Sequence, residues 1–431
     1  MILLAVLHAV SGPAAHLSAS QDSLPRVTLA EALQRAARLD PNYVRAVGSI
    51  DNSAWARRAA ITAMVLPSIN LSTDYTAFSR DQFNVGTSAP ARTSATMRID
   101  ARYELFTGGR KLSEVSRTAA DQESAIAGEV QQRFQTALDT EADYYSVLSN
   151  RELLDVSRDR VRRAEEGFVT ARARVVSGAA VQTDSLQLML ELDRARIDLL
   201  NAESRLRIAR LMLGRRVGAG GPVDAVSLDT MPAPDLPISL SQAVTETIEL
   251  GPEYRVARAN ERSAEAALRG RRAFYMPQAV LSANNVGFGD RPFTRGLTRS
   301  SVTVSVTFPL WDNAQRELAF SRARTTRDLA RLTREDLERS AQADVTAAYE
   351  AYQTARATAE VSVRGVQIAR EVYRVQEARY RAGASTILDL LDAQSGLTEA
   401  QATLVQARYA ARLALAGLEA MLGRRLFTDK E

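Results

Sequence analysis

The sequence contains no cysteine, and its only histidines are His8 and His16, close to the N-terminus. Beyond these two positions the chain has no thiolate nucleophile, no imidazole base and no soft metal ligand. Lysine occurs only at Lys111 and Lys430, and neither completes the Gly-Lys-Ser/Thr end of a phosphate-binding loop. We therefore expect no catalytic residue, no cofactor and no metal site, and carboxylate chemistry is the one enzymatic option left open.

Long apolar runs are also missing. No segment after residue 10 reaches the roughly 18 to 20 consecutive apolar residues that a membrane-spanning helix needs. Residues 1–20 are mostly apolar or small and end at Ser18-Ala19-Ser20, so we expect a signal peptide there. If the chain crosses a membrane, it does so without helices.

Neither sign of charge is in large excess. Lysine and arginine number 55 against 51 acidic residues, for a net charge of +4. The basic residues stand among acidic ones at helical intervals rather than in clusters with aromatic residues. This pattern argues against a nucleic-acid partner.

The sequence does contain one pattern that occurs twice. The matching pairs are Pro41 and Pro252, Leu66-Pro67 and Met276-Pro277, Gly178 and Gly383, and the Leu-Gly-Arg-Arg motifs at 213–216 and 422–425. Their nearly constant spacing indicates an internal duplication that is far longer than a solenoid period. We predict a first repeat at 27–213, a Gly- and Pro-rich linker at 214–237, a second repeat at 238–425 and a tail at 426–431.

Both repeats have the same predicted order of elements. Initial helices at 27–64 and 239–274 stop near a proline, where the residue period changes from helical to alternating. A β-hairpin follows at 66–106 and 276–311, with loops expected at 80–93 and 289–298. Long helices then fill 109–213 and 313–422, with breaks at Gly178 and Gly383. The uninterrupted stretch 112–176 would extend about 100 Å as a helix.

The predicted strands have one apolar and one polar face. Between 95 and 105, apolar residues alternate with polar ones that include Arg98, Asp100 and Arg102. Segments 68–78 and 301–310 alternate as well, whereas 278–288 alternates poorly. Strands of about ten residues suit a tilted strand that crosses a bilayer, but four strands cannot close a barrel within one chain. We expect copies of the chain to pool their strands, with these three charged residues lining the lumen; the alternative is the wet face of an ordinary sheet.

Two segments are especially distinctive. They are Leu105-Phe106-Thr107-Gly108-Gly109-Arg110 before the first long helix and Arg379-Tyr380-Arg381-Ala382-Gly383-Ala384-Ser385-Thr386-Ile387-Leu388-Asp389-Leu390-Leu391-Asp392-Ala393-Gln394 at the second break. Together with the duplicated helices and hairpins, they make the chain resemble the TolC-like outer-membrane efflux proteins over nearly all of its mature length.

The resemblance implies a mainly α fold with membrane β-strands. Its duplicated helical hairpins would form a trimeric α-barrel, and four strands from each protomer would contribute to a 12-stranded outer-membrane β-barrel. The implied partners are two further copies of the chain in a homotrimer, a periplasmic adaptor (membrane fusion) protein, an inner-membrane pump of the RND or ABC type, and outer-membrane lipid. The implied location is the Gram-negative outer membrane, with most of the helical mass in the periplasm.

The resemblance also assigns roles to residues at the two helix breaks, which form the periplasmic tip of the tunnel in this family. The implied gate residues are Tyr380, Asp184, Thr183, Asp389, Asp392 and Arg408. Tyr380 and Asp184 of neighbouring coiled coils would bond to hold the entrance shut, and Asp389 and Asp392 would form carboxylate rings that favour cations. The implied adaptor-docking residues are Ser177, Gly178, Ala179, Ala382, Gly383 and Ala384.

Spacing alone allows simpler roles for some of these residues. Thr386-x-x-Asp389 is also a capping box, and Asp184 lies in a first helical turn, where the helix dipole favours acids. The glycine at each break also serves a helix–helix turn that needs a left-handed residue. One departure from TolC itself is Ser385, which stands where TolC has an arginine that helps to lock the entrance. The lock must therefore be weaker here or be built differently.

The leading functional interpretation is a passive export duct. Because the chain has no histidine, cysteine or methionine cluster to form a metal-selective lining, we favour small molecules over metal ions as cargo. The alternative is a soluble periplasmic coiled-coil scaffold or adaptor, in which the hairpins pack on one another.

Overall fold

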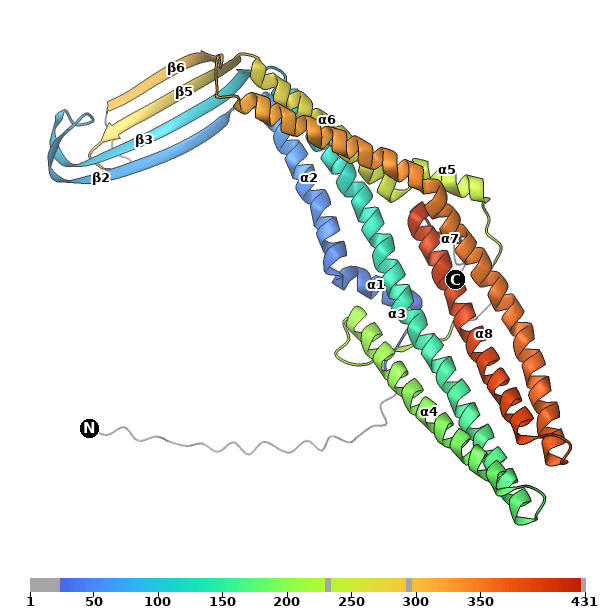
Figure 1. Ribbon diagram of the computed structural model, residues 1–431. Coiled ribbons are helices and arrows are strands. Elements are labelled where there is room, and N and C mark those ends of the chain that lie inside the picture. Colours follow the sequence, from blue (N-terminus) through green and yellow to red (C-terminus); the bar gives the residue numbers. More distant parts are fainter. Residues whose placement is uncertain (1–23, 229–233, 292–296, 428–431) are drawn as a thin grey trace, which may run out of the picture.

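The computed structural model describes residues 24–228, 234–291 and 297–427. Figure 1 shows an elongated chain with the sheet at one end and long helical hairpins that extend away from it. The signal peptide expected at residues 1–20 lies outside the described residues, as do parts of the linker, the second hairpin loop and the tail.

The two repeats have the same order of helices and strands. The first contains α1 (Leu29–Leu39), α2 (Pro41–Val65), β2 (Ser68–Asn84), β3 (Ala89–Phe106), α3 (Arg110–Val176) and α4 (Gln182–Arg216). The second contains α5 (Leu240–Leu250), α6 (Pro252–Arg272), the short 3-10 helix η1 (Ala273–Tyr275), β5 (Gln278–Gly289), β6 (Leu297–Thr307), α7 (Gln315–Arg381) and α8 (Ile387–Leu422). Helices α3 and α7 both have 67 residues, which agrees with the predicted duplication.

Local side-chain chemistry fixes where several helices begin. Thr28 accepts a hydrogen bond from the backbone N–H of Glu31 at the start of α1, and Ser239 forms a capping box with Gln242 at the start of α5. These caps satisfy backbone donors that have no partner inside the helix. A proline at the first position then starts both α2 and α6, where its missing N–H costs nothing.

Each strand-to-helix turn contains two consecutive left-handed residues. In the first repeat they are Gly108 and Gly109, with φ of 61° and 90°. In the second repeat they are Asn313 and Ala314, with φ of 55° and 60°. Glycine adopts this conformation without a steric penalty, whereas alanine does not. The second repeat therefore keeps the same turn at some cost in backbone strain. The shared turn also shows that Gly108 and Asn313 occupy equivalent positions in the two repeats.

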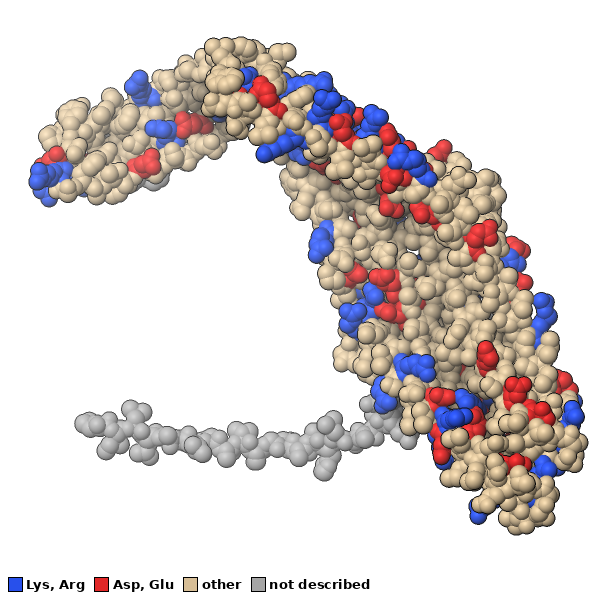
Figure 2. Space-filling model, in the orientation of Figure 1, with Lys and Arg blue, Asp and Glu red and all other residues tan. Residues whose placement is uncertain are grey.

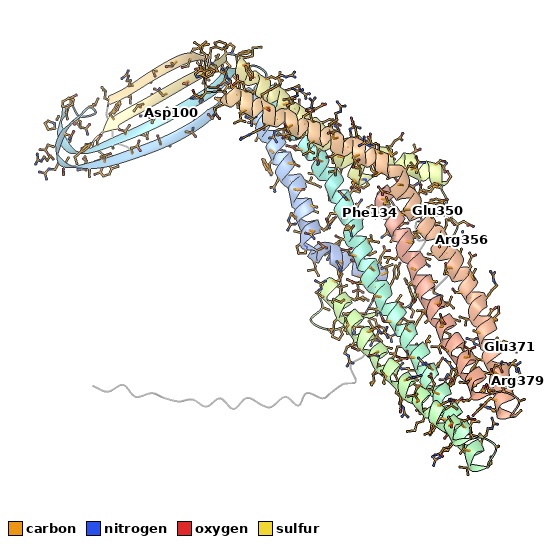
Figure 3. The ribbon with its side chains drawn as sticks, in the orientation of Figure 1. Asp100, Phe134, Glu350, Arg356, Glu371 and Arg379 are labelled. Atoms are coloured by element: carbon orange, nitrogen blue, oxygen red, sulfur yellow. The ribbon has the colours of Figure 1, made fainter. Side chains whose placement is uncertain are left out.

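The four long strands form one antiparallel sheet in the order β2-β3-β5-β6. The pairing register places Asn70, Asp100, Asn284 and Ser301 side by side across the four strands. The next positions, Ile69, Ala101, Ala283 and Val302, form a parallel row on the opposite face. Since side chains alternate along a strand, the sheet has one polar and one apolar face over its central part. Figure 3 labels Asp100 within this sheet.

The first hairpin is longer than the sequence predicted. Strands β2 and β3 contain 17 and 18 residues rather than about ten, so most of the loop expected at 80–93 is strand. The reason is that pairing resumes beyond an irregularity between Ala77 and Gln82. Near the turn, the Asn84 side-chain amide donates to the carbonyl oxygens of Thr93 and Gly289, both at 2.9 Å. A polar side chain thus holds the extended hairpin against the neighbouring strand.

The linker also contains structure that its composition did not predict. A short parallel pair joins β1 (Arg26–Val27) to β4 (Asp224–Ala225) within the stretch read as linker. Tyr144, which is fully buried in α3, donates its hydroxyl to the carbonyl of Val226 at 2.7 Å. Tyr352 in α7 is also fully buried and donates to the carbonyl of Pro234 at 2.5 Å. A buried tyrosine from each long helix therefore holds the linker, one at Val226 and the other at Pro234.

The Leu-Gly-Arg-Arg motifs end α4 and α8 in matching ways. Arg216 pairs with Asp143 on α3 at 2.7 Å, and Arg425 pairs with the buried Glu141 on the same helix at 2.6 Å. Both pairs fix the ends of the shorter helices to α3. Figure 2 shows basic and acidic side chains interspersed along the helices, with fewer charges on the visible part of the sheet.

None of the helices in the described part of the chain combines the length and the apolar character that a membrane crossing requires. The same residues contain no group of three or more acidic or histidine side chains that could hold a metal ion.

Candidate functional site

The two helix breaks lie together at the end of the molecule opposite the sheet (Figure 1). Gly178 and Gly383 have φ of 75° and 77°, so both use the left-handed conformation that ends a helix. The residue after each glycine donates its N–H to a carbonyl one turn back, Ala179 to Arg174 and Ala384 to Arg379, both at 2.8 Å. The predicted turn geometry is therefore present, with the same hydrogen bonds, in both repeats.

Arg174 connects the two hairpins at this end. Its Nη1 donates to the backbone oxygen of Tyr380 at 2.5 Å, and its guanidinium lies 4.6 Å from the centre of the Tyr380 ring. Its Nη2 also donates to the carbonyl of Ala179 in its own turn, at 3.3 Å. The matching arginine of the second repeat, Arg379, donates to its own turn at Ala384 at 3.4 Å. Figure 3 shows Arg379 at the far end of α7.

Tyr380 is buried where the two hairpins meet. It is 2% exposed and packs in a small cluster with Ala171, Leu188, Ile387 and Leu390. Burial raises the pKa of Tyr380, the nearby Asp184 carboxylate raises it further, and Arg174 lowers it. Within the described residues the Tyr380 hydroxyl is buried and has no hydrogen-bond partner. The structure thus brings Tyr380 and Asp184 close together without joining them by a hydrogen bond.

Asp389 forms the capping box of α8. Its Oδ2 accepts from the backbone N–H of Thr386 at 3.0 Å and from the Thr386 hydroxyl at 2.8 Å. The Ser385 hydroxyl lies 3.0 Å from the same oxygen. These hydrogen bonds, led by the one from the backbone, lower the pKa of Asp389. One turn further along the same exposed face, Asp392 makes no hydrogen bond or ion pair to any described residue.

The other two predicted gate residues lie in different settings. Thr183 is exposed beside Asp184 in the first turn of α4, and the N-cap of that helix is Val181, which makes no side-chain cap. The carboxylate of Asp184 therefore does not cap α4. Arg408 lies about 30 Å along α8 from its first residue. It pairs there with Glu152 on α3 at 3.2 Å, so the structure does not bring it together with the residues at the tip.

The comparison with protein families addresses both repeats at once. The model of the family described as "Outer membrane efflux protein" matches residues 51–219 and 244–424. The chain belongs to this family. The predicted resemblance is therefore confirmed, and the two matched segments correspond to the two repeats.

Several relatives of this efflux protein have known names or structures. The pyoverdine export outer membrane protein OpmQ of Pseudomonas putida is 25% identical over 385 residues, which cover 85% of this chain and 79% of OpmQ. Protein CyaE of Bordetella pertussis is 32% identical over 173 residues, which cover 39% of this chain and only 35% of CyaE. The CmeC outer membrane channel of Campylobacter jejuni has the same fold, with a TM-score of 0.78 at 14% identity over 93% of this chain and 87% of CmeC.

Family membership establishes the general function of this efflux protein. It is an outer-membrane channel of export systems and not an enzyme. Its long helical hairpins and four antiparallel strands per chain are those of the family's channels, which are trimers within tripartite systems. The alternative of a soluble periplasmic scaffold is thereby set aside.

Sequence reasoning missed Arg174. The duplication could have drawn attention to it, because Arg174 and Arg379 each stand one turn before a glycine break. What the sequence could not show is that only the first of these matching arginines reaches Tyr380 in the other hairpin. That difference depends on how the hairpins of this efflux protein lie against each other.

Proposed function

We propose that this efflux protein is a duct for small molecules that is closed at the hairpin tips and opened by its partners. The observation that carries the proposal is the bond from Arg174 to the backbone of Tyr380, which ties the two hairpins of one protomer together. A contact between two separate helical hairpins is one that an opening movement has to break. Because opening and closing differ by such contacts, a partner that separates the tips shifts the channel toward the open state.

In this proposal the closed tip is held by Arg174, Tyr380 and Asp184. Ser385 stands where TolC has an arginine that helps to lock the entrance, but its hydroxyl donates to Asp389 within its own turn. Arg174 supplies a cationic contact from the other hairpin instead. Tyr380 contributes by packing its buried ring between the two hairpins, and Asp184, with Thr183 beside it, lies close enough to interact electrostatically with Tyr380.

Asp392 is the proposed cation-selective residue of the entrance. It lies one turn beyond the capping Asp389, is exposed and pairs with no described residue. In a trimer the three copies would form a ring of carboxylates, which concentrates cations at a constriction. Asp389 contributes to the same ring while also capping α8, and Arg408, which is bound to Glu152, acts as a structural residue away from the entrance.

The remaining proposed roles follow the two ends of the duct. At the tips, residues 177–179 and 382–384 form exposed turns that suit docking of a periplasmic adaptor, which links the channel to an inner-membrane pump. At the other end, Arg98, Asp100 and Arg102 belong to the polar face of the sheet and would line the lumen. The opposite face carries exposed apolar side chains such as Ile69, Leu71 and Val302, which suit outer-membrane lipid.

The cargo can be tested separately from the gate. Cells that lack this protein should accumulate small toxic compounds, and expression of the wild-type protein should restore their export. Unchanged compound accumulation together with loss of a secreted protein would refute the small-molecule proposal.

For the gate, purified trimers in planar bilayers should form cation-selective pores that are mostly closed. Pores that stand fully open without partners would contradict a closed resting tip.

A further inference from the structure

One stripe of α3 supplies four contacts to the second hairpin. Its residues are Glu141, Glu152, Arg163 and Arg174, which are spaced 11 residues apart. Because 11 residues make about three helical turns, side chains at this spacing lie along one face of the helix. The stripe changes from acidic to basic between Glu152 and Arg163, so its two halves bind the second hairpin in different ways.

The acidic half of the stripe is held by ion pairs. Glu141 is buried and pairs with Arg425, just after α8, at 2.6 Å. Glu152 pairs with Arg408 on α8 at 3.2 Å and accepts a hydrogen bond from the Tyr409 hydroxyl at 2.5 Å. Opposite charges therefore fix α8 to α3 over this part of the contact.

Arg163 meets the second hairpin without a carboxylate partner. Its Nη2 donates to the hydroxyl of Thr398 on α8 at 3.2 Å, and its guanidinium lies 5.8 Å from the centre of the Tyr373 ring on α7. Its Nε is buried and has no hydrogen-bond partner among the described residues. The acid one turn back on α3, Asp159, pairs with Arg162 at 2.7 Å. Within the part of the chain that the structure describes, Arg163 is thus a partly buried charge that makes one hydrogen bond.

The burial of this charge is unfavourable. Desolvation lowers the pKa of Arg163, because the loss of water disfavours the charged guanidinium. Tyr373 and Asp159 oppose this shift, whereas Arg162 and Arg160 add to it. A charge that is buried without a paired and hydrogen-bonded partner costs free energy. The contact between the hairpins therefore has a cost at Arg163 that exposure to water would remove.

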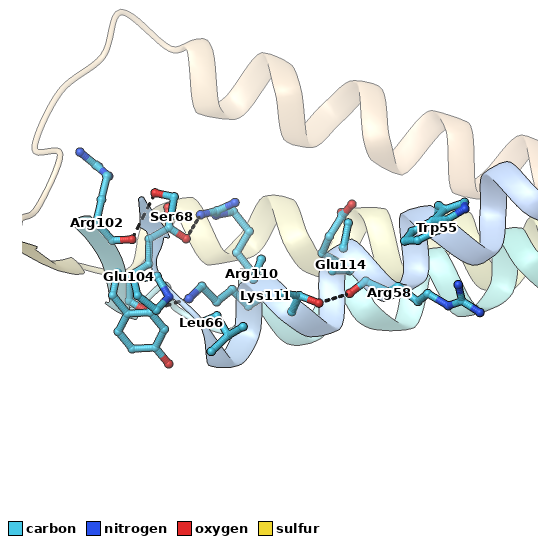
Figure 4. Close-up of a pocket in the computed structure, with 15 residues that line it drawn as sticks. Trp55, Arg58, Leu66, Ser68, Arg102, Glu104, Arg110, Lys111 and Glu114 are labelled. Atoms are coloured by element: carbon cyan, nitrogen blue, oxygen red, sulfur yellow. Dashed lines mark hydrogen bonds and ion pairs between the residues drawn. The ribbon is translucent and has the colours of Figure 1, made fainter. Parts of the chain in front are cut away.

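Other partly buried arginines of α3 show how such a charge is matched by a carboxylate. Arg110 pairs with Glu104 at 2.6 Å, and Figure 4 shows both residues beside a cavity that borders the sheet. Arg160, less than one turn from Arg163, pairs with Glu191 on α4 at 2.7 Å. Arg163 differs from them because it faces the second hairpin, where α8 presents a hydroxyl in place of a carboxylate.

The face of α8 opposite this arginine is polar. Gln394, Thr398 and Gln401 recur at helical spacing between the buried Leu390 and Val405. Gln394 is 3% exposed, and its Nε2, like Oε1 of Gln401, is buried with no partner in the described ranges. The Thr398 hydroxyl donates to the Gln394 carbonyl at 2.9 Å, so it keeps a partner without the arginine. This part of the contact thus contains polar groups that gain hydrogen bonds when it opens to water.

We propose that Arg163 favours the open state of this efflux protein, because its unmatched charge is buried whenever the hairpins close. It therefore acts against Arg174, whose tie to Tyr380 holds the tips together. The proposal rests on the closed, partner-opened duct of the proposed function, and it adds a residue whose removal makes the channel open less. The opposing effects of the two arginines keep the closed state only moderately favoured, so that partners can shift it.

Replacement of Arg163 by methionine tests the sign of its effect. Arg163→Met keeps an unbranched side chain in the contact but removes the charge, so single-channel openings should become roughly three- to tenfold rarer. The decrease is measured in the Arg174→Ala background, in which openings are expected to be frequent. Arg163→Lys keeps the charge and should not reduce opening. The control Arg172→Met removes an exposed arginine of the same helix that forms no ion pair with any described residue, and it should leave opening unchanged.

A carboxylate at position 398 provides a second test, because its effect depends on Arg163. Thr398→Asp alone supplies the missing partner and should reduce opening in the Arg174→Ala background. Combined with Arg163→Met in the otherwise wild-type protein, the same substitution buries an unpaired carboxylate, so openings should become more frequent than in wild type. This reversal of sign would identify charge, rather than a change of shape, as the cause.

The possible failures of the proposal and of the proposed function are distinguishable. Unchanged or more frequent opening of Arg163→Met would overturn the proposal and leave the closed duct intact. An equal effect of Thr398→Asp with and without Arg163 would also overturn it. Wild-type trimers that stand fully open would instead remove the closed state on which the proposed function depends. Light scattering and circular dichroism verify that each variant is a folded trimer, so that a change in assembly is not mistaken for a change in opening.

Discussion

Replacing Arg174 by alanine removes the proposed tie between the hairpins while leaving both tip turns in place. The change deletes a charged hydrogen bond to the Tyr380 carbonyl, which contributes about 1.5–3 kcal/mol, and a cation–π contact of about 0.5–1 kcal/mol. Because Arg174 is partly exposed, we take about 2 kcal/mol per protomer as the expected loss. At about 1.4 kcal/mol per tenfold change, the ratio of open to closed tips should rise about 30-fold.

The control for this prediction is Arg379→Ala. Arg379 occupies the matching position and makes the matching bond to its own turn, but it donates to Ala384 and not to the other hairpin. In single-channel recordings we expect frequent spontaneous openings for Arg174→Ala and nearly wild-type closure for Arg379→Ala. Arg174→Lys, which keeps the charge but loses the fork of donors, should lie between them. Equal opening frequencies for the two alanine variants would refute the reasoning, provided that both remain trimers with wild-type circular dichroism.

Three further predictions concern the tip and the packing of the helix ends. Asp392→Asn should lower the cation-to-anion permeability ratio several-fold without changing trimer yield, and an unchanged reversal potential under a salt gradient would contradict the carboxylate ring. Asp389→Asn should speed amide hydrogen exchange in the first turn of α8. Because folding lowers the pKa of Asp389 below its ordinary value, the carboxylate stabilises the folded chain at neutral pH, and this stabilisation is lost as the pH falls through the lowered pKa. The exchange rates of wild type and variant should therefore converge at that low pH. Gly423→Ala should destabilise the protein by roughly 1–2 kcal/mol more than Gly178→Ala, as measured by thermal unfolding. Both glycines have positive φ, but a Cβ at Gly423 would lie 2.6 Å from Pro252, whereas one at Gly178 meets open space. Equal shifts in melting temperature would show that backbone strain alone accounts for the loss of stability.

Much of the fold could be predicted because its signals are local. Proline at the start of α2 and α6, the capping residues Thr28 and Ser239, and the glycine at each break determine where helices begin and end. The change from helical to alternating period marks the hairpins. These signals occur twice, so each repeat supports the interpretation of the other, and the family likeness follows from the same residues.

The errors and omissions have a common physical origin. The full length of β2 and β3 depends on pairing beyond an irregularity, and the short β1–β4 pair depends on two segments that are distant in sequence. Likewise, the sequence spacing alone identifies Asp389 as a helix cap. The role of Arg408, about 30 Å from the tip at about 1.5 Å per residue along α8, depends on its ion pair with Glu152, which only the tertiary structure shows.

The sequence by itself determined the duplicated helices, the hairpins, the breaks and the lack of cysteine and of histidine after residue 16, because propensity, capping and residue chemistry act over a few neighbouring positions. Only the tertiary structure decided which of two matching arginines crosses to the other hairpin, and why Ala266 on α6 is buried while Trp55, at the matching position on α2, is exposed. Those outcomes depend on contacts between elements that are hundreds of residues apart, and a duplicated sequence cannot distinguish them, because its two copies are alike while their surroundings differ.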